Sequence, residues 1–354
     1  MEPLKGKIVI AGPCSVESLA QMRQVARALA PFGIAALRGG VWKPRTRPGA
    51  FQGVGARGLA WLKDAGRSVG LPVACEVADP GHVEQCLQHG IDILWIGART
   101  TGSPFAVQAV ADALKGAHVP VLVKNPMNPD LELWIGAIER LLAAGVPQVW
   151  AVHRGFSTWR RTAFRNEPLW RIPLDLRRRL PKLPLLCDPS HICGSRRLIP
   201  AIAQEALDLL FDGLMLEVHP APARALSDAS QQITPTAFGR LLARLKIKKA
   251  NSRVEDYRDH IRDLRERIDD LDAQLLAVLG RRMAAVREIS RYKRKYGVSA
   301  FQPGRWKQIV ASRTEAGVRQ GLGADFVLRI FQHVHEEAIR QQEQAGDGAP
   351  REPS

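Results

Sequence analysis

Side chains able to bind anions or metal ions recur directly after short apolar segments in the first two thirds of the chain. They are Cys14, Arg38, Glu76, Arg99, Lys124, His153 with Arg154, Asp188 with His191, and Glu217 with His219. If the apolar segments are parallel strands arranged as a barrel, their carboxyl ends meet at one mouth and these side chains converge there. Several Lys and Arg side chains in one mouth would be stabilised by a polyanion. The pattern therefore predicts a site for a small anionic ligand.

Four residues of this region could also hold a metal ion: Cys14, His191, Glu217 and Asp228. A thiolate, an imidazole and two carboxylates suit a first-row divalent ion such as Mn²⁺, Fe²⁺ or Zn²⁺ better than Mg²⁺ or Ca²⁺. The four residues are far apart in the chain, however. A single cysteine after a strand is more often a small buried apolar residue, and a single histidine is often a core residue. The residue types alone leave both interpretations open.

The elements that must position these residues alternate in type over residues 1–245. Eight apolar, strand-like runs occur there: KIVIAG (7–12), IAALRG (34–39), PVACEV (72–77), DILWIGA (92–98), PVLVKN (120–125), QVWAVHR (148–154), LPLLCD (183–188) and GLMLEVH (213–219). Segments such as 19–30, 105–116, 131–145 and 198–210 between them have helical periodicity. Eight repeats of this size predict an α/β fold, a (β/α)8 TIM barrel. An open doubly wound sheet is the alternative, although GPCS after the first run lacks a G-x-G-x-x-G turn.

A different pattern follows residues 246–254, which are polar and basic and which we interpret as a linker. From 256 to about 296 apolar residues recur at three- and four-residue steps without a proline, which predicts one helix of roughly 60 Å. We expect further helices around 305–317 and 325–343, hence a smaller all-α domain over 255–345, and a disordered tail at 346–354. A helix this long cannot bury its apolar side on its own chain. We therefore expect a homodimer, or a tetramer, formed through this domain.

Composition narrows the class of protein. The chain has 354 residues, of which 45% are hydrophobic and 24% charged, and no apolar run approaches the length that crosses a bilayer. The net charge of +16 lies mostly before residue 250, without a basic arm, and only 6% of residues are aromatic, which favours small anions over nucleic acid. The N-terminus shows no secretory leader and the five cysteines are sparse, so we expect a cytoplasmic protein without membrane contact or disulfides.

Long motifs in residues 1–245 resemble a known enzyme family. They are AGPCSVES (11–18), RGGVWKPRTRPGAFQGVG (38–55), GARTTGSPFAVQ (97–108), VKNP (123–126), HRGFS (153–157), DPSHICGSRR (188–197) and EVHPAPARALSDASQQ (217–232). They resemble the type Iβ 3-deoxy-D-arabino-heptulosonate 7-phosphate (DAHP) synthases, which condense phosphoenolpyruvate with erythrose 4-phosphate in the shikimate pathway. The resemblance implies one divalent ion, Mn²⁺, Fe²⁺, Zn²⁺ or Co²⁺, bound by Cys14, His191, Glu217 and Asp228.

The same resemblance assigns the cationic residues. It implies that Arg38 and Lys43 bind the carboxylate of phosphoenolpyruvate and that Arg99, Lys124 and Arg154 bind its phosphate, with Lys43 and Lys124 in the catalytic set.

The sugar phosphate is assigned by resemblance as well. Arg45 and Thr46 would bind it, with Arg196 as a second candidate. The stretch KPRT (43–46) stands where the similar 3-deoxy-manno-octulosonate 8-phosphate synthases carry a KANRS stretch. The resemblance therefore favours erythrose 4-phosphate over arabinose 5-phosphate.

The long C-terminal helix carries Arg265, Arg282 and Lys293, which are 17 and 11 residues apart. We expect these three to face one side of the helix, where they could bind a dicarboxylate. The alternative is that their charges are only solvated and that the helices serve for dimerisation.

The stretch LRERIDDLDAQLLAVLGRR (264–282), with SRYKRK (290–295), resembles the all-helical chorismate mutases. The resemblance implies that Arg265, reaching into the partner's pocket, and Arg282, Lys293 and Arg305 bind chorismate, while Lys293 and Gln342 contact its ether oxygen. Three positions depart from the family: Gln302 replaces an acidic residue, Trp306 a glutamate that contacts the substrate hydroxyl, and Ala338 a serine.

Together these resemblances predict a bifunctional enzyme that makes DAHP and converts chorismate to prephenate. The first alternative is a monofunctional synthase whose helical tail only dimerises and senses chorismate or prephenate. More remote alternatives are an enzyme of the octulosonate type and a basic nucleic-acid-binding barrel. Steep salt dependence of binding would distinguish the last of these.

Overall fold

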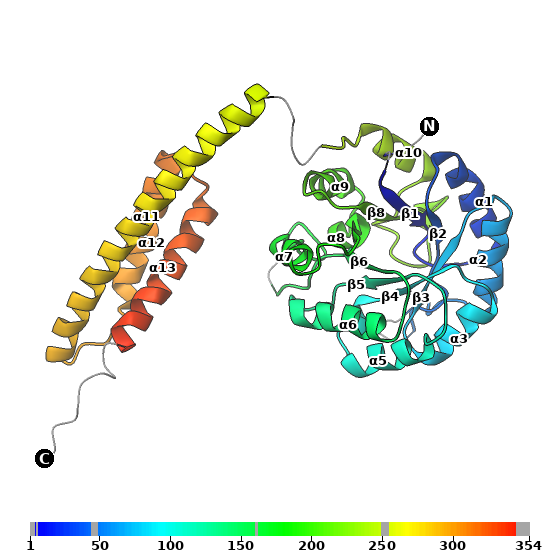
Figure 1. Cartoon of the computed structure of the whole chain (residues 1–354), viewed down its shortest axis with the longest axis horizontal. Coiled ribbons are helices and arrows are strands. Elements are labelled where there is room, and N and C mark those ends of the chain that lie inside the picture. The colour runs from blue at the N-terminus through cyan, green and yellow to red at the C-terminus, as the bar shows by residue number, and fades with distance from the viewer. Residues whose placement is uncertain (1–3, 5, 44–48, 160–161, 249–254, 345–354) are drawn as a thin grey trace, which may run out of the picture. The chain divides into compact units, whose positions relative to one another are not determined.

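The computed structural model describes residues 4, 6–43, 49–159, 162–248 and 255–344. The chain divides into two compact units, Met1–Ala250 and Asn251–Ser354. The first is a ring of parallel strands enclosed by helices, and the second consists of three helices lying side by side (Figure 1). The predicted 346–354 tail, and residues 249–254 of the predicted linker, lie outside the described residues.

The sheet of the first unit is closed. Its strands are β1 (Ile8–Gly12), β2 (Ala36–Arg38), β3 (Val73–Val77), β4 (Ile93–Ile96), β5 (Val121–Lys124), β6 (Val149–His153), β7 (Leu185–Cys187) and β8 (Gly213–Glu217). Neighbours in sequence pair in parallel, and β8 pairs with β1 in register from Ile8↔Gly213 to Gly12↔Glu217. The predicted (β/α)8 barrel is therefore confirmed. The doubly wound alternative is wrong because an open sheet would leave β1 and β8 unpaired.

Helices connect the strands along the outside of the barrel (Figure 1). They are α1 (Leu19–Leu29), α2 (Arg57–Arg67), α3 (Pro80–Gln88), α4 (Ala98–Thr101), α5 (Pro104–Ala113), α6 (Leu131–Ala143), α7 (Arg171–Arg179), α8 (Pro189–Cys193), α9 (Ile199–Asp208) and α10 (Pro235–Arg244), with 3₁₀ turns η1 (Ala30–Phe32) and η2 (Pro222–Arg224). Side-chain caps fix several of the helix starts: Ser18, Asp79 and Ser103 accept hydrogen bonds from the backbone N–H groups of Gln21, His82 and Ala106.

Two apolar layers hold the barrel together. Inside it, every strand contributes to one cluster, made of Ile10, Ala36, Ala74, Ile93, Trp95, Leu122, Val152, Leu186 and Met215. The opposite faces of the same strands pack against the helices in a larger cluster. Strands buried on both faces explain why the sequence shows continuous apolar runs instead of alternation. The interior is filled, so polar chemistry is confined to the ends of the strands.

The second unit contains α11 (Glu255–Lys295), α12 (Pro303–Arg319) and α13 (Ala324–Gln344). Its internal core is small: Met283, Val286 and Ala338 are buried, with Val334 packed against them. Large apolar side chains of α11 remain exposed, among them Leu271 at 62% and Leu275 at 56%. Three helices of one chain thus leave much of their apolar surface uncovered. No helix in the described ranges is both long and apolar enough to cross a membrane.

Candidate metal centre and anion sites

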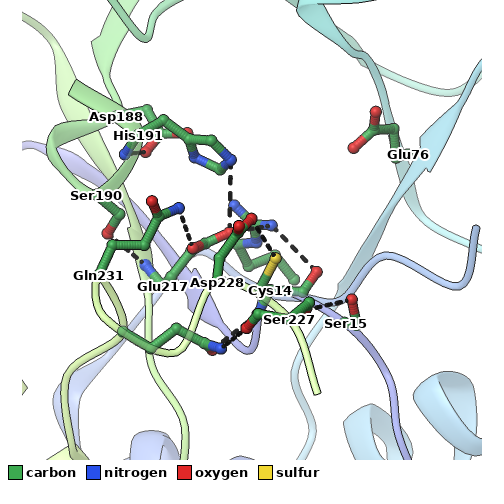
Figure 2. A network of polar contacts seen from close by, with 12 residues as sticks. Cys14, Ser15, Glu76, Asp188, Ser190, His191, Glu217, Ser227, Asp228 and Gln231 are labelled. Carbon is green, nitrogen blue, oxygen red and sulfur yellow. Dashed lines mark hydrogen bonds and ion pairs between the residues drawn. The ribbon is translucent and has the colours of Figure 1, made fainter. Parts of the chain in front are cut away.

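Four side chains from separate parts of the barrel meet at the carboxyl ends of its strands (Figure 2). Cys14 follows β1, Glu217 ends β8, Asp228 lies beyond β8 and His191 lies in α8. One ligand atom each from Cys14, Glu217 and Asp228 lie within 4.8 Å of one another. The Nε2 atom of His191 is 3.7 Å from Oε1 of Glu217. The structure therefore brings together the four residues that the sequence analysis nominated as metal ligands.

A lysine ammonium already lies among these groups. Nζ of Lys43 donates to Sγ of Cys14 and to Oδ2 of Asp228, each at 2.8 Å. Burial, together with the Glu217 and Asp228 carboxylates, raises the pKa of the Cys14 thiol to about 12, although Lys43 acts in the opposite direction. Burial opposes the charge on Lys43, but Cys14 and Asp228 hold the pKa of its ammonium above the ordinary value. The space beside Cys14 and Asp228 thus favours a positively charged group.

His191 is oriented by the residue that caps its own helix. Asp188 accepts a hydrogen bond from the backbone N–H of His191 at 3.0 Å, and its Oδ2 lies 2.8 Å from Nδ1 of the His191 ring. Nζ of Lys124 also donates to this carboxylate, at 2.7 Å. Burial lowers the pKa of His191, so the ring is neutral near neutral pH and Nε2 can act as a ligand. A carboxylate behind a ligating imidazole is a common support in metal sites.

Glu217 is fully buried and held on several sides. Nη2 of Arg38 lies 3.2 Å from its Oε1, Nε2 of Gln231 donates to Oε2 at 2.7 Å, and its backbone N–H donates to Oγ of Ser190. Burial favours the neutral acid, but His191 and Arg38 hold its pKa below the ordinary value. The carboxylate is therefore charged and fixed.

Asp228 occupies a backbone conformation that non-glycine residues seldom adopt, with φ of 45°. Its Oδ1 accepts from Nη1 of Arg165 at 3.1 Å, and the same Nη1 donates to Gln231 at 2.7 Å. Burial disfavours the charge on Asp228, but Lys43 and Arg165 hold its pKa far below the ordinary value. A strained backbone held by several partners is typical of a functional position.

The supporting side chains Asp188, Arg165, Gln231 and Gln232 were not among the predicted site residues. Asp188 stood in the strand-end series and could have been assigned from that position. Gln231 and Gln232 lie close after Asp228 in the polar stretch SDASQQ (227–232), and Gln232 accepts from the backbone N–H of Cys14. Arg165 lies in the segment between β6 and α7, where nothing in the sequence pattern marks it.

Cationic side chains line the same mouth. Arg38 is 2% exposed and its guanidinium lies 4.8 Å from the Trp95 ring, with Nε and Nη1 buried and unpartnered within the described part of the chain. Burial lowers the pKa of Arg154 to about 10, with help from the neighbouring Arg165 and Arg99 and against the opposing effect of Asp188. Arg99 itself is exposed in α4. Cations that destabilise one another in this way would be stabilised by a bound anion.

Three further predicted residues concern the sugar phosphate, and two of them, Arg45 and Thr46, lie outside the described residues. Arg196 is exposed and donates to the backbone carbonyls of Ala229 and Ser230, beside Asp228. Glu76 lies apart from the cluster in Figure 2. Its Oε2 accepts a hydrogen bond from Nε1 of Trp95 at 3.0 Å.

The donor set fits a divalent first-row ion. Three buried or half-buried donors that can carry negative charge lie within reach of one another, and a neutral imidazole nitrogen faces them. The thiol is the discriminating member, because Mg²⁺ and Ca²⁺ prefer oxygen ligands and soft sulfur selects transition metals.

The helical unit also contains partly buried polar residues, on α11 and α13. The side chains of Arg282, Lys293 and Gln342 are half-buried, and Nζ of Lys293 donates to the carbonyl oxygen of Ala300 at 2.7 Å. Nη1 of Arg282 and Oε1 of Gln342 are buried without a hydrogen-bond partner among the described residues. Trp306 stacks on His335, with ring centroids 4.3 Å apart.

The two remaining predicted residues of this unit, Arg265 and Arg305, are exposed. We expected Arg265 to share one side of the helix with Arg282 and Lys293. The 11-residue step is about three turns, but the 17-residue step is about 4.7 turns, so Arg265 lies on a different side of a regular helix. That expectation was wrong.

Comparison with known proteins gives the same division of the chain. The model of the DAHP synthetase I family matches residues 5–251, and the model of chorismate mutase type II matches residues 264–343. A phospho-2-dehydro-3-deoxyheptonate aldolase of Thermotoga maritima is 32% identical over 238 residues, which cover 67% of this chain and 68% of that protein. A 2-dehydro-3-deoxyphosphooctonate aldolase of a Bradyrhizobium species is 28% identical over 266 residues, covering 68% and 89%.

Solved structures agree with the sequence relatives. The crystal structure of the Thermotoga maritima phospho-2-dehydro-3-deoxyheptonate aldolase (DAHP synthase) superposes with a TM-score of 0.61 at 32% identity, over 68% of each chain. A truncated 3-deoxy-D-arabino-heptulosonate 7-phosphate synthase of the same organism gives a TM-score of 0.58 at 29% identity, over 68% of this chain and 85% of that one.

Proposed function

The chain belongs to the DAHP synthetase I family and carries a chorismate mutase type II domain behind its barrel, and on this premise we propose which residues perform the two reactions. The first is the condensation of phosphoenolpyruvate, erythrose 4-phosphate and water to DAHP and inorganic phosphate. The second is the rearrangement of chorismate to prephenate. The family is metal-dependent, and the native ion of this chain is one of Mn²⁺, Fe²⁺, Zn²⁺ and Co²⁺.

Cys14, His191, Glu217 and Asp228 hold the ion. When bound, it acts as a Lewis acid that polarises the aldehyde of the sugar phosphate. Asp188 keeps the neutral His191 ring in its ligating orientation, and Arg165 and Gln231 fix the two carboxylates. Lys43 stabilises the cluster through Cys14 and Asp228, and with an ion held there its ammonium would be available to the carboxylate of phosphoenolpyruvate.

The cationic residues hold the other substrate. Arg38 binds the carboxylate of phosphoenolpyruvate with the guanidinium nitrogens that Glu217 leaves free, while Lys124, Arg154 and Arg99 bind the phosphate. As carbon 3 attacks the aldehyde, positive charge develops at carbon 2, and water adds there before phosphate leaves. Guanidinium and ammonium groups fixed in a buried mouth stabilise the anionic groups during these steps without reorganisation.

Sugar specificity is the part of the proposal that concerns the second substrate. Arg45 and Thr46 of KPRT bind the phosphate of erythrose 4-phosphate, with Arg196 beside the Asp228 loop as the second candidate. Because some relatives of this chain are octulosonate-type aldolases, the competing substrate is arabinose 5-phosphate. Phosphate release from phosphoenolpyruvate with each aldose, in the presence of Mn²⁺, tests the assignment. We expect at least tenfold higher kcat/KM with erythrose 4-phosphate, and equal values would contradict it.

The observation that carries the synthase proposal is the meeting of Cys14, Glu217 and Asp228 within 4.8 Å beside the buried cations of the mouth. Salt bridges alone would explain the paired charges, but they would not explain a buried thiol placed between two carboxylates. A thiol in that position has a raised pKa, which only a strongly positive partner can reverse.

In the helical unit, Arg282 and Arg305, with Arg265 of a second copy of the chain, bind the two carboxylates of chorismate. Lys293 and Gln342 hydrogen-bond the ether oxygen, which gains negative charge as the carbon–oxygen bond breaks. Restriction of the substrate and electrostatic stabilisation suffice, since the rearrangement needs no proton transfer. The apolar surface that α11 leaves exposed supports a homodimer.

The alternative is that this unit only dimerises and senses chorismate or prephenate. Chorismate consumption by the full-length chain, with an Arg282→Ala variant beside it, separates the two. We expect prephenate formation that falls at least a hundredfold in the variant. Chorismate that binds to the wild type without being converted would favour the sensor.

A further inference from the structure

One buried polar atom of the helical unit has no role in the proposed mutase reaction. In the described part of the chain, Nη1 of Arg282, Nε2 of His335 and Oε1 of Gln342 are all buried without a hydrogen-bond partner. Arg282 lies on α11, and His335 and Gln342 lie on α13. Arg282 and Gln342 already have proposed substrate contacts, but His335 does not. Buried polar groups without partners cost free energy, and Arg282 lies near enough to His335 to affect its pKa, so these two groups indicate a ligand site.

The His335 ring is fixed by aromatic neighbours. It stacks on Trp306 of α12 with centroids 4.3 Å apart and planes 9° apart, and the Phe301 ring lies 5.9 Å away. Stacking uses a face of the imidazole ring. The ring nitrogens remain available for hydrogen bonds, which form in the plane of the ring. Nε2 is therefore held in place as a hydrogen-bonding group.

The charges around the ring keep it neutral. Burial lowers the pKa of His335, and Arg282 and Lys293 of α11 lower it further, while Glu336 of its own helix acts in the opposite direction. From α12 the ring meets the uncharged Trp306. A neutral imidazole can accept one hydrogen bond and donate another, whereas an imidazolium can only donate.

We propose that Nε2 of His335 hydrogen-bonds the ring hydroxyl of chorismate. The inference rests on the proposed mutase function of this unit. In the chorismate mutases that this unit resembles, a glutamate contacts this hydroxyl. Trp306 stands at that position in this chain, and an indole has no hydrogen-bond acceptor. Ala338, in place of a serine, offers no polar group either. Of the three buried atoms without a partner in the described part of this unit, those of Arg282 and Gln342 are already assigned to a carboxylate and to the ether oxygen, which leaves Nε2 of His335 for the hydroxyl.

A comparison of two substrates tests the contact in the full-length chain. The substrates are chorismate and its analogue without the ring hydroxyl, and the enzymes are the wild type and His335→Leu. We expect His335→Leu to lower kcat/KM for chorismate by about tenfold to a hundredfold, the range for an unpaired polar group, and to leave kcat/KM for the analogue within about twofold. His333→Leu is the matched control, because His333 is exposed on the same helix and lies near Glu336. It should change neither value.

A second variant guards against a purely structural effect. His335→Gln keeps a polar side chain that cannot titrate, so it should recover part of the loss with chorismate. It should also remove the decline in kcat/KM that the wild type shows as His335 becomes protonated at acid pH. Equal losses with both substrates, or unchanged activity in His335→Leu, would overturn the inference. A wild type that converts no chorismate would overturn the mutase proposal itself and the inference with it.

Discussion

Oδ2 of Asp188 lies 2.8 Å from Nδ1 of His191, and the opposite nitrogen of that ring faces Glu217. One carboxylate has two roles here: Asp188 caps the start of α8 and also orients the imidazole of His191 in the same helix. The geometry of the proposed metal site thus depends on a residue that is not itself a proposed ligand.

We predict that Asp188→Asn lowers the affinity for Mn²⁺ or Zn²⁺ about 10- to 100-fold, because an amide supports the neutral His191 ring less well than a carboxylate does. Isothermal titration of the metal-free protein measures this. Asp130→Asn is the matched control, since Asp130 caps α6 in the same way without touching the cluster. An affinity for Asp188→Asn equal to that of the control would show that the orientation of His191 does not depend on Asp188.

Arg165 supports the second carboxylate. We expect Arg165→Met to reduce metal affinity and synthase kcat/KM by at least tenfold, because Asp228 in its strained conformation and Gln231 both lose a charged donor. Arg23→Met, which removes an exposed pair with Asp64, should leave both values unchanged. If Arg165→Met reduced phosphoenolpyruvate binding alone, Arg165 would belong to the anion site and not to the support of Asp228.

The exposed apolar residues of α11 predict the oligomeric state. Replacement of Leu271 and Leu275 by glutamate places charge on the surface that we assign to a second copy of the chain, so sedimentation should show dissociation to monomers. Mutase activity should fall with it, since Arg265 of the second copy is needed. Phe105→Glu is the control, because Phe105 is 91% exposed on the barrel helix α5. An unchanged mass for the double variant would place the interface elsewhere.

The sequence predicted the strand positions well because each barrel strand is apolar on both faces. The eight runs ended within a few residues of the observed strands, and the residues at their ends, such as Arg38 and Lys124, reached the mouth as expected. The mouth residues in loops could not be found in this way. Arg165 and Gln231 reach the cluster through long, irregular connections, and no periodicity marks a residue that acts through a loop.

In the helical unit the pattern predicted the helices but not the site. The apolar spacing gave the extent of α11 within a residue or so, whereas the charged residues along it gave little guidance. Arg265 and Arg282 do not share a side, and His335 has the spacing of an ordinary core residue. Its position became informative only when the structure placed it on Trp306.

The buried His153 should make the folded barrel less stable at acid pH. It is fully buried beside Trp170 and Phe156, and burial, with Arg154 adding to it, lowers its pKa from 6.5 to about 3. The unfolded chain therefore binds a proton that the folded chain does not, between about pH 6.5 and pH 3. The free energy of unfolding should fall as pH falls through this window, by about 2 kcal/mol at pH 5 from this residue alone.

Urea unfolding of wild type and His153→Phe at pH 7.5 and pH 5 measures this contribution. The variant should lose less stability on acidification than the wild type, since phenylalanine takes up no proton. His118→Phe, at an exposed position before β5, serves as the control and should follow the wild type. Parallel losses in His153→Phe and the wild type would mean that other groups cause the acid sensitivity.

Phosphate release from phosphoenolpyruvate in the presence of erythrose 4-phosphate, before and after chelation, tests the central claim most directly. The wild type should lose at least about a hundredfold in rate when its metal is removed and should recover on addition of Mn²⁺. Cys14→Ala and His191→Ala should stay inactive after the same treatment, although their barrels remain folded. Near wild-type turnover in either variant after chelation and metal replacement would contradict the assignment of the metal centre.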